Sequence, residues 1–340
     1  MSSDWPRISA IIAARNAAAT LPRCLDALLA QVSDDVEVLV VDDYSTDDTR
    51  AVVSRYPVKL IALPQHAGVA AARNRGAEAS PGEVLFFLDA DVVLAPGGMR
   101  RVRDSLAHPE IGAVMGSYDD EPEDQSIVSR FKNLAHHHFH QRASAEASTF
   151  WGACGAIRRE HFVAAGGFDE KRFKLPSIED VELGSRLVDR GVRIVLDREL
   201  QVKHLKKWTL ASLIITDVTR RAIPWTLLWM ERRQLHSDLN FSSTQRIAAM
   251  VAVAIVLALF LAMVNPRGWL LLAALMAAGY FLNRDLFGLL YAKGGTRLAL
   301  AGFFLQQLYY LYSLLGLALG LAIYFANSLS RHENQPLKQL

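Results

Sequence analysis

The sequence is poor in cysteine and in net charge, and each shortage excludes a class of protein. Its 340 residues include two cysteines, Cys24 and Cys154, which lie far apart and predict no disulfide framework. The formal net charge is +2, so the sequence has no basic excess of the kind that nucleic-acid binding requires. We therefore expect a reducing compartment and no nucleic-acid partner.

The first residues predict no signal peptide, and charged residues are scarce in a long stretch of the second half. The first apolar run, in MSSDWPRISAIIAARN, is short and is followed at once by Arg15. Residues up to about 245 mix charges with short apolar runs, whereas residues 247–326 are nearly free of charge. We expect a globular domain, residues 1–206, that stays in the cytoplasm, followed by a membrane-spanning region, residues 246–326.

The membrane region divides into three predicted spans. Residues 247–264 contain no charge, and their length approaches the roughly 20 apolar residues that cross a bilayer. Residues 268–290 are apolar only in their first part, so two spans plus a re-entrant hairpin are the alternative. Residues 298–326 are long enough to span with tilt. Three spans return the basic loop before residue 298 to the cytoplasm, which predicts a multi-pass protein of the inner (plasma) membrane.

Two further segments flank these spans. Residues 207–245 mix aromatic and aliphatic side chains with paired arginines, a pattern typical of amphipathic helices in the membrane interface. Residues 327–340 are polar, and we expect a disordered tail there.

Strand-like and helix-like segments alternate through the first half of the globular domain. The apolar runs Ile8–Ile12, Val36–Val41, Val58–Leu63 and Val84–Leu88 are typical of buried strands, and helical patterns separate them. This rhythm predicts an α/β fold, a Rossmann-like and mostly parallel sheet with helices on both faces. Ligands of such sheets bind beyond the carboxyl ends of the strands.

Acidic residues stand at that predicted edge. Asp89-Ala90-Asp91 follows a buried run, and paired carboxylates can bind Mg²⁺ or Mn²⁺ together with water and substrate phosphates. The ion would neutralise a diphosphate leaving group; the alternative is an ordinary solvated turn. Asp43 ends the second strand and can accept hydrogen bonds from a nucleotide base or ribose, or belong to a helix-capping turn.

Two later residues are candidates for chemistry. Asp180 lies in the first turn of a predicted helix, 178–190, where a carboxylate could take a proton from an attacking hydroxyl. Acidic residues are also common in first turns because they stabilise the helix. His204 lies beyond the last strand of the domain and could complete a metal site or be structural.

Other polar residues give weaker signals. Arg15 and Arg73 can contact phosphates or form surface ion pairs. The histidines at 136–138 and 140 resemble a metal cluster, but only 136 and 140 share a helix face, so we expect a half-exposed helix. The first strand–helix turn reads AARNAAAT and lacks G-x-G-x-x-G, which excludes a dinucleotide-dependent oxidoreductase.

Taken in order, these motifs resemble family 2 glycosyltransferases with the GT-A fold. The resemblance covers about residues 7–206 and rests on several segments at consistent spacing. These are ISAIIAARN, VEVLVVDDYSTDDT, HAGVAAARNRGAEASPGEVLFFLDADVVLAPG, GACGAIRREHFVAAGGFDE and IEDVELGSRLVDRGVRI, with VKH following.

The resemblance implies a role for each matching position. Asp43 matches the residue that reads the nucleotide base, and Asp89 and Asp91 match the D-x-D that contacts ribose and metal. Asp180 matches the general base of inverting transfer, and His204 matches a histidine that ligates the metal in some relatives. Relatives often carry Pro or Thr where Ala13 stands, which leaves a base contact there either missing or made by the main chain alone.

The implied activity is inverting transfer of a sugar from a nucleoside-diphosphate sugar, UDP- or GDP-linked, with a divalent metal as cofactor. The Q-x-x-R-W motif of processive synthases is missing, since the nearest stretch reads RRAIPW. A hydroxyl of a lipid-linked or glycan acceptor at the cytoplasmic face of the membrane is therefore the expected acceptor. The alternatives are a polyprenyl-phosphate glycosyltransferase, a polysaccharide synthase subunit and an inactive membrane scaffold.

Overall fold

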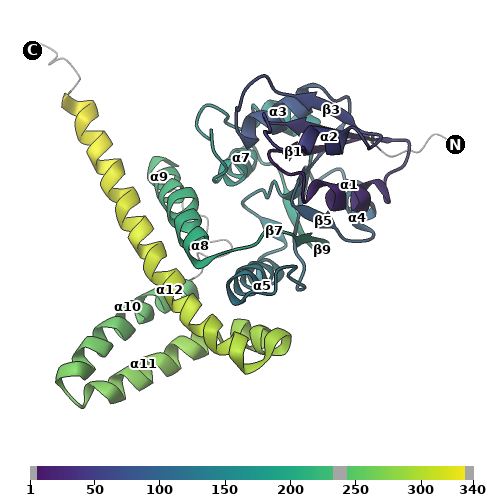
Figure 1. Cartoon of the computed structure of the whole chain (residues 1–340). Helices are drawn as coiled ribbons and strands as arrows, with labels where there is room; N and C mark the ends of the chain where they lie inside the picture. Colours follow the sequence, from purple (N-terminus) through teal and green to yellow (C-terminus); the bar gives the residue numbers. More distant parts are fainter. Residues whose placement is uncertain (1–5, 233–242, 334–340) are drawn as a thin grey trace, which may run out of the picture. The chain divides into compact units, whose positions relative to one another are not determined.

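A computed structural model describes residues 6–232 and 243–333 of the chain. It divides into two compact units, Met1–Lys207 and Trp208–Leu340, and each is described here by itself (Figure 1).

The first unit contains, among the described residues, a nine-stranded sheet with the order β3-β2-β1-β4-β8-β6-β9-β5, and β7 pairs with β9. Strands β1, β2, β3, β4, β6 and β9 run in one direction, and β5, β7 and β8 run in the other. The predicted α/β fold is confirmed, with a sheet that is mixed rather than purely parallel. The strands are β1 (Ile8–Ala14), β2 (Val36–Asp42), β3 (Lys59–Ala62), β4 (Val84–Asp89), β5 (Val92–Leu94), β6 (Ala113–Tyr118), β7 (Glu146–Ala147), β8 (Cys154–Arg158) and β9 (Ile194–His204).

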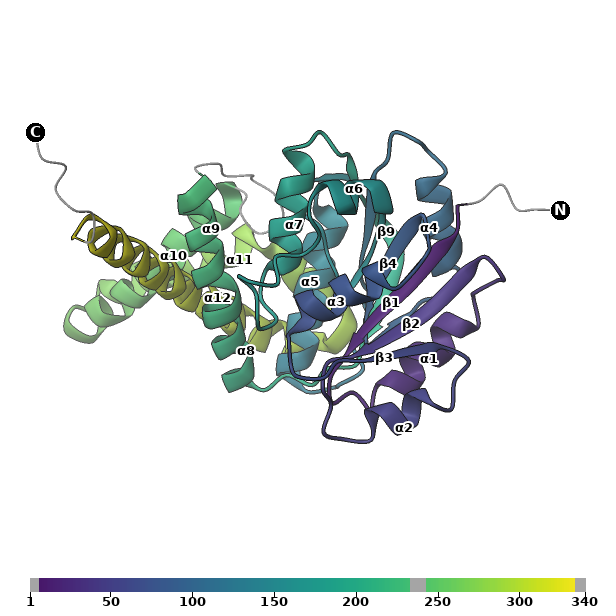
Figure 2. The ribbon, with the colours of Figure 1, turned by 90° about the horizontal axis from the view of Figure 1, so that it is seen from above.

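Helices cover both faces of this sheet because successive side chains of a buried strand point in opposite directions (Figure 2). Ile8, Ala10 and Ile12 of β1 pack into one core with α1, α2 and α4. Ile11 points to the other face, where Gly76 of α3 packs directly on it. The helices are α1 (Leu21–Leu29), α2 (Thr49–Val53), α3 (Val69–Glu78), α4 (Gly98–Leu106), α5 (Ile127–Arg142), α6 (Arg159–Ala164) and α7 (Glu179–Val188).

Strand register brings the candidate residues to one edge of the sheet. Ala13 of β1 pairs with Asp89 of β4, and Ala14 pairs with Asp42 of β2. Antiparallel pairing of β5 with β9 sets Val92 opposite His204, and so places the D-x-D segment beside the end of β9. Pairing between strands far apart in sequence thus assembles the site.

The second unit is helical. Its described helices are α8 (Leu210–Thr216), a π-helical turn η1 (Asp217–Ala222), α9 (Ile223–Arg232), α10 (Ser243–Val264), α11 (Gly268–Leu282) and α12 (Arg284–Glu333). Two stretches, Ser243–Val264 and Arg284–Ser328, are long and apolar enough to cross a membrane, and α11 is shorter. The predicted span 268–290 is divided at Asn283, where α11 ends, so the number of spans stays a prediction.

Helix α12 is interrupted at Gly294 and Gly295. Farther along, it makes a close contact with η1 and α9. Gly316 and Gly320, spaced as G-x-x-x-G, meet Ala222 and Thr226, so the two backbones approach closely. Much of the segment predicted as interfacial, 207–245, therefore packs along α12 (Figure 1). Residues 233–242 of that segment, and 334–340 of the predicted tail, lie outside the described residues.

Candidate active site

Asp43 directly follows β2 and is 4% exposed. Its Oδ1 accepts a hydrogen bond from the Ala67 N–H at 2.7 Å, and its Oδ2 accepts one from Gly68 N–H at 2.9 Å. His66 Nδ1 lies 2.8 Å from the same Oδ2. A carboxylate has about four lone-pair sites, so Asp43 can accept a further hydrogen bond from a ligand.

Arg15, which follows β1, is joined to Asp43 through His66. Arg15 Nη1 lies 3.1 Å from His66 Nε2, and a guanidinium can only donate. A hydrogen bond from Arg15 to this nitrogen requires the tautomer whose proton is on Nδ1, the nitrogen that faces Asp43. Sequence reasoning missed His66, because a lone loop histidine carries no signal of its own.

Arg73 lies in α3 with its side chain 3% exposed. Its Nη2 is 2.7 Å from Asp89 Oδ1, and its Nη1 is 2.9 Å from Glu179 Oε1. A Cβ at Gly152 would lie 2.7 Å from the same Nη1, so only glycine fits there without displacing the guanidinium. The structure thus places Arg73, an expected phosphate contact, in ion pairs that join the D-x-D segment to α7.

Asp89 and Asp91 are each about one-third exposed at the end of β4. Burial raises the pKa of Asp89, an effect that the Asp91 charge reinforces and the Arg73 charge opposes. Burial acts on Asp91 as well, but the nearby His204, together with Lys206, lowers its pKa below the usual value. Asp91 is therefore the carboxylate held ionised.

His204 ends β9 and points its Nε2 at Asp91 Oδ2, 3.5 Å away. Among the described residues, no group of three His, Cys, Asp or Glu side chains is arranged to hold a metal ion. A carboxylate and an imidazole nonetheless fit a divalent ion that takes its remaining ligands from substrate phosphates and water. The two side chains could hold such an ion only together with a ligand.

Asp180 lies in the first turn of α7. Its Oδ2 accepts a hydrogen bond from the Gly152 N–H at 2.9 Å, and its Oδ1 accepts one from the Val181 N–H at 2.8 Å. Burial, followed by the neighbouring Glu179 charge, raises the pKa of Asp180 to about 6, although Arg73 opposes the shift. A carboxylate with this pKa can accept a proton near neutral pH.

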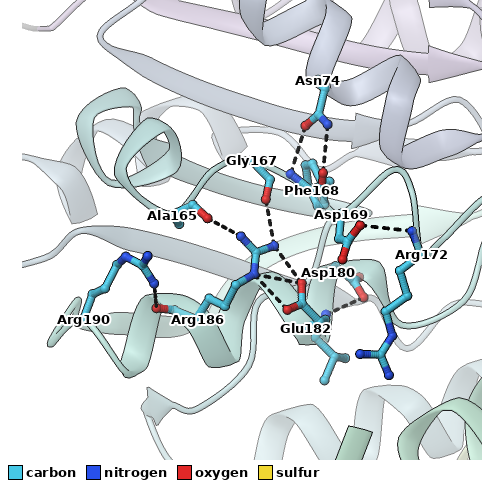
Figure 3. Close-up of polar contacts among 11 residues, drawn as sticks. Asn74, Ala165, Gly167, Phe168, Asp169, Arg172, Asp180, Glu182, Arg186 and Arg190 are labelled. Carbon is cyan, nitrogen blue, oxygen red and sulfur yellow. Dashed lines mark hydrogen bonds and ion pairs between the residues drawn. The ribbon is translucent and has the colours of Figure 1, made fainter. Parts of the chain in front are cut away.

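Helix α7 is anchored by Arg186, one turn below the site (Figure 3). Its guanidinium donates to the carbonyl oxygens of Ala165 and Gly167 and pairs with Glu182 at 2.7 Å. Glu182 is thus structural, as acids in a first helical turn often are.

The loop before α7 is also fastened to α3 (Figure 3). The Asn74 amide donates to the Phe168 carbonyl oxygen at 2.9 Å and accepts from the Phe168 N–H at 2.9 Å. Phe168 packs edge-on against Phe87 of β4, which ties the loop to the core. These contacts fasten the loop that leads to α7 to both α3 and the sheet.

The histidines of α5 contact the backbone of β6. His137 Nδ1 lies 2.8 Å from the Tyr118 carbonyl oxygen, and His140 Nδ1 lies 3.2 Å from that of Gly116. Burial lowers the pKa of His140 to about 4, so this ring is neutral. Residues 136–138 are half-buried and residue 140 is buried, so the helix is half-exposed with one covered face.

Residues 9–164 match the family model described as Glycosyl transferase family 2. The succinoglycan biosynthesis protein ExoO of Rhizobium meliloti is 41% identical over 100 residues, which are 28% of this chain and 29% of that protein. The validoxylamine A glucosyltransferase of Streptomyces hygroscopicus subsp. jinggangensis is 32% identical over 234 residues, 58% of this chain and 55% of that protein. The chain thus spans about half, or less, of the length of these curated relatives.

Solved structures share the fold. The mannosyltransferase PcManGT from Pyrobaculum calidifontis, in complex with GDP-Man and Mn²⁺, aligns with a TM-score of 0.58 at 22% identity, covering 93% of this chain and 88% of that one. GalNAc-T7 with UDP, GalNAc and Mn²⁺ aligns with a TM-score of 0.50 at 15% identity, covering 68% of this chain and 51% of that one. At these identities the likeness shows the fold alone.

Proposed function

We propose, from the premise that the globular domain of this chain belongs to glycosyltransferase family 2, that the protein transfers a sugar from a nucleoside-diphosphate sugar to an acceptor hydroxyl with inversion. The observation that carries the proposal is the ion-pair connection between Asp89, Arg73 and Glu179, the residue directly before Asp180. It holds a donor-binding carboxylate and a carboxylate of raised pKa in one rigid arrangement.

The reaction is a single displacement. Asp180 accepts the proton of the acceptor hydroxyl as the hydroxyl oxygen bonds to the anomeric carbon. The bond from that carbon to the diphosphate oxygen breaks, and the nucleoside diphosphate leaves with the bonding electron pair. A pKa of about 6 keeps Asp180 ionised at neutral pH and yet basic enough to take the proton.

Asp43 and Arg15 are proposed to bind the nucleotide, with a main-chain contact from Ala13. Asp43 keeps acceptor capacity for a base N–H, and the exposed side chain of Arg15 contacts the other ring nitrogen of His66. Asp89 is proposed to contact the ribose. Uridine and guanosine diphosphates are the two candidates, since the two structural neighbours were solved with GDP-Man and UDP.

Asp91 and His204 would hold a divalent ion, Mg²⁺ or Mn²⁺, which supplies charge neutralisation for the diphosphate when bound. Both structural neighbours were solved with Mn²⁺. The ionised state of Asp91 and the approach of His204 to it support this assignment.

A lipid-linked or membrane-associated acceptor at the cytoplasmic face is proposed because the second unit contains helices long and apolar enough to cross a membrane. Among the relatives are proteins of succinoglycan and O-antigen biosynthesis, which also fits an acceptor at the cell envelope. We place the protein in the inner membrane on the same grounds.

The test is calorimetric titration of the detergent-purified protein with UDP and GDP, each with and without Mn²⁺. We expect metal-dependent binding of one nucleotide, lost in Asp43→Ala and kept in Asp48→Asn, an exposed acid of the same turn. A folded protein that binds neither nucleotide would contradict the proposal and favour an inactive scaffold.

A further inference from the structure

His204 is held by neighbours to which the proposed function gives no role. Its Nδ1 lies 3.1 Å from Oδ1 of Asn133, a residue of α5. Its ring stacks on Tyr118 at the end of β6, with 4.5 Å between centroids and 10° between planes. The imidazole is therefore fixed both in its plane and in its rotation.

The contact with Asn133 also fixes the tautomer. An amide oxygen only accepts hydrogen bonds, so Nδ1 of His204 donates to it, and Nε2 is the ring nitrogen left to bind a cation. Nε2 lies 3.5 Å from Asp91 Oδ2, at the outer limit of hydrogen bonding. Two ligands at about 2.1 Å from one ion lie roughly 3.0–3.5 Å apart, so this separation suits two ligands of a shared cation.

The amide nitrogen of Asn133 gives no reason for an asparagine at this position. The residue is 2% exposed, and among the described residues its Nδ2 has no hydrogen-bond partner. An unpaired buried N–H group lowers stability, so the amide nitrogen does not account for an asparagine at this position. What the asparagine supplies is the acceptor that faces His204.

The histidines of α5 set the position of this acceptor. Asn133, His137 and His140 are spaced four and three residues apart, so they share one face of the helix. His137 and His140 contact carbonyl oxygens of β6, the strand that neighbours β9. The helix is therefore fastened in the register that brings Asn133 to His204.

We propose that Asn133 is a positioning residue that holds His204 in the tautomer able to bind a divalent cation together with Asp91. The proposal rests on the metal-dependent donor binding put forward above. Asn133 contacts neither substrate nor cation; it acts through the hydrogen bond that it accepts from His204.

The test compares Asn133→Leu, which removes the acceptor, with Asn133→Asp, which keeps it and adds charge. His138→Leu puts the same side chain on another face of α5 and is the control. Mn²⁺ binding is measured in the presence of UDP or GDP from the electron paramagnetic resonance signal of free Mn²⁺. We expect Mn²⁺ affinity to fall about 10- to 100-fold in Asn133→Leu and to be unchanged in His138→Leu. Asn133→Asp should bind at least as tightly as the wild type.

A second readout is the nitrogen coupling of bound Mn²⁺ in pulsed resonance spectra. We expect this coupling in the wild type and in Asn133→Asp, and its loss in Asn133→Leu. Unchanged Mn²⁺ affinity and coupling in Asn133→Leu would overturn the assignment of Asn133 while leaving the donor site intact. If Asn133→Leu does not fold, weakened Mn²⁺ binding in folded Asn133→Asp would overturn it instead. Nucleotide binding by the wild type without any Mn²⁺ dependence would refute both proposals.

Discussion

The guanidinium of Arg73 lies 2.9 Å from the carboxylate of Glu179, and both side chains are almost fully buried. The same guanidinium pairs with Asp89 at 2.7 Å, so a single cation joins the D-x-D segment to the helix that carries Asp180. Arg73 and Glu179 act on Asp180 with opposite sign, because the cation lowers its pKa and the anion raises it. Replacing Arg73 and replacing Glu179 should therefore shift the pKa of Asp180 in opposite directions.

Replacing Arg73 by Met should move the acid limb of the pH–rate profile to higher pH. Asp180 must be ionised to accept a proton, so activity falls as pH drops below its pKa of about 6. Removing a nearby cation raises that pKa by about one unit or more. The measurement is kcat/KM against pH, and Arg73→Lys, which keeps the charge, should shift less. A profile identical to that of the wild type would show that Arg73 does not act on the base.

Replacing Glu179 by Gln should move the acid limb of the pH–rate profile to lower pH. The substitution removes the anion beside Asp180 and leaves Arg73 in place, so the ionised form of Asp180 is favoured. We expect a downward shift of up to about one pH unit. Glu78→Gln, an exposed acid of α3, is the matched control and should leave the profile unchanged. An upward shift in Glu179→Gln would contradict the electrostatic account.

Replacing Asp180 by Asn should abolish proton transfer without removing the donor site. Turnover should fall on the order of 10²- to 10⁴-fold, the usual contribution of a general base. Nucleotide affinity should stay near that of the wild type, because the Asp43, Asp89 and Asp91 side chains are unchanged. Turnover is measured under donor saturation, and affinity by calorimetry. Full turnover in the variant would show that another group takes the proton.

Replacing Gly316 by Ala should destabilise the helical unit. A Cβ at Gly316 would lie 2.5 Å from that of Ala222, whereas one at Gly288, on the same helix, would meet nothing within 4 Å. Overpacking of this kind costs about 1–3 kcal/mol. Thermal unfolding in detergent should therefore show a lower Tm for Gly316→Ala and an unchanged or higher Tm for Gly288→Ala. Equal Tm values for the two variants would mean that the contact does not constrain the unit.

The sequence predicts the strands of the first half closely, because short continuous apolar runs between helical patterns have few other interpretations. Ile8–Ile12 and Val84–Leu88 fall within β1 and β4. The later strands follow no strict strand–helix alternation, so the antiparallel course of β8 between β4 and β6 could not be read from the sequence. The division of the predicted span 268–290 at Asn283 is likewise a result of folding, since apolar composition alone does not mark the end of a helix.

By itself, the sequence determined the α/β architecture and the chemical character of the site: carboxylates at strand ends, and apolar helices after the globular domain. Local pattern suffices for these because burial and strand ends leave periodic traces in the chain. Only the tertiary structure decided which groups meet. Arg73 meets Glu179 across 106 residues of sequence, and Asn133 meets His204 across 71. Such contacts depend on strand register and helix packing between distant segments, and the sequence near each residue carries no record of them.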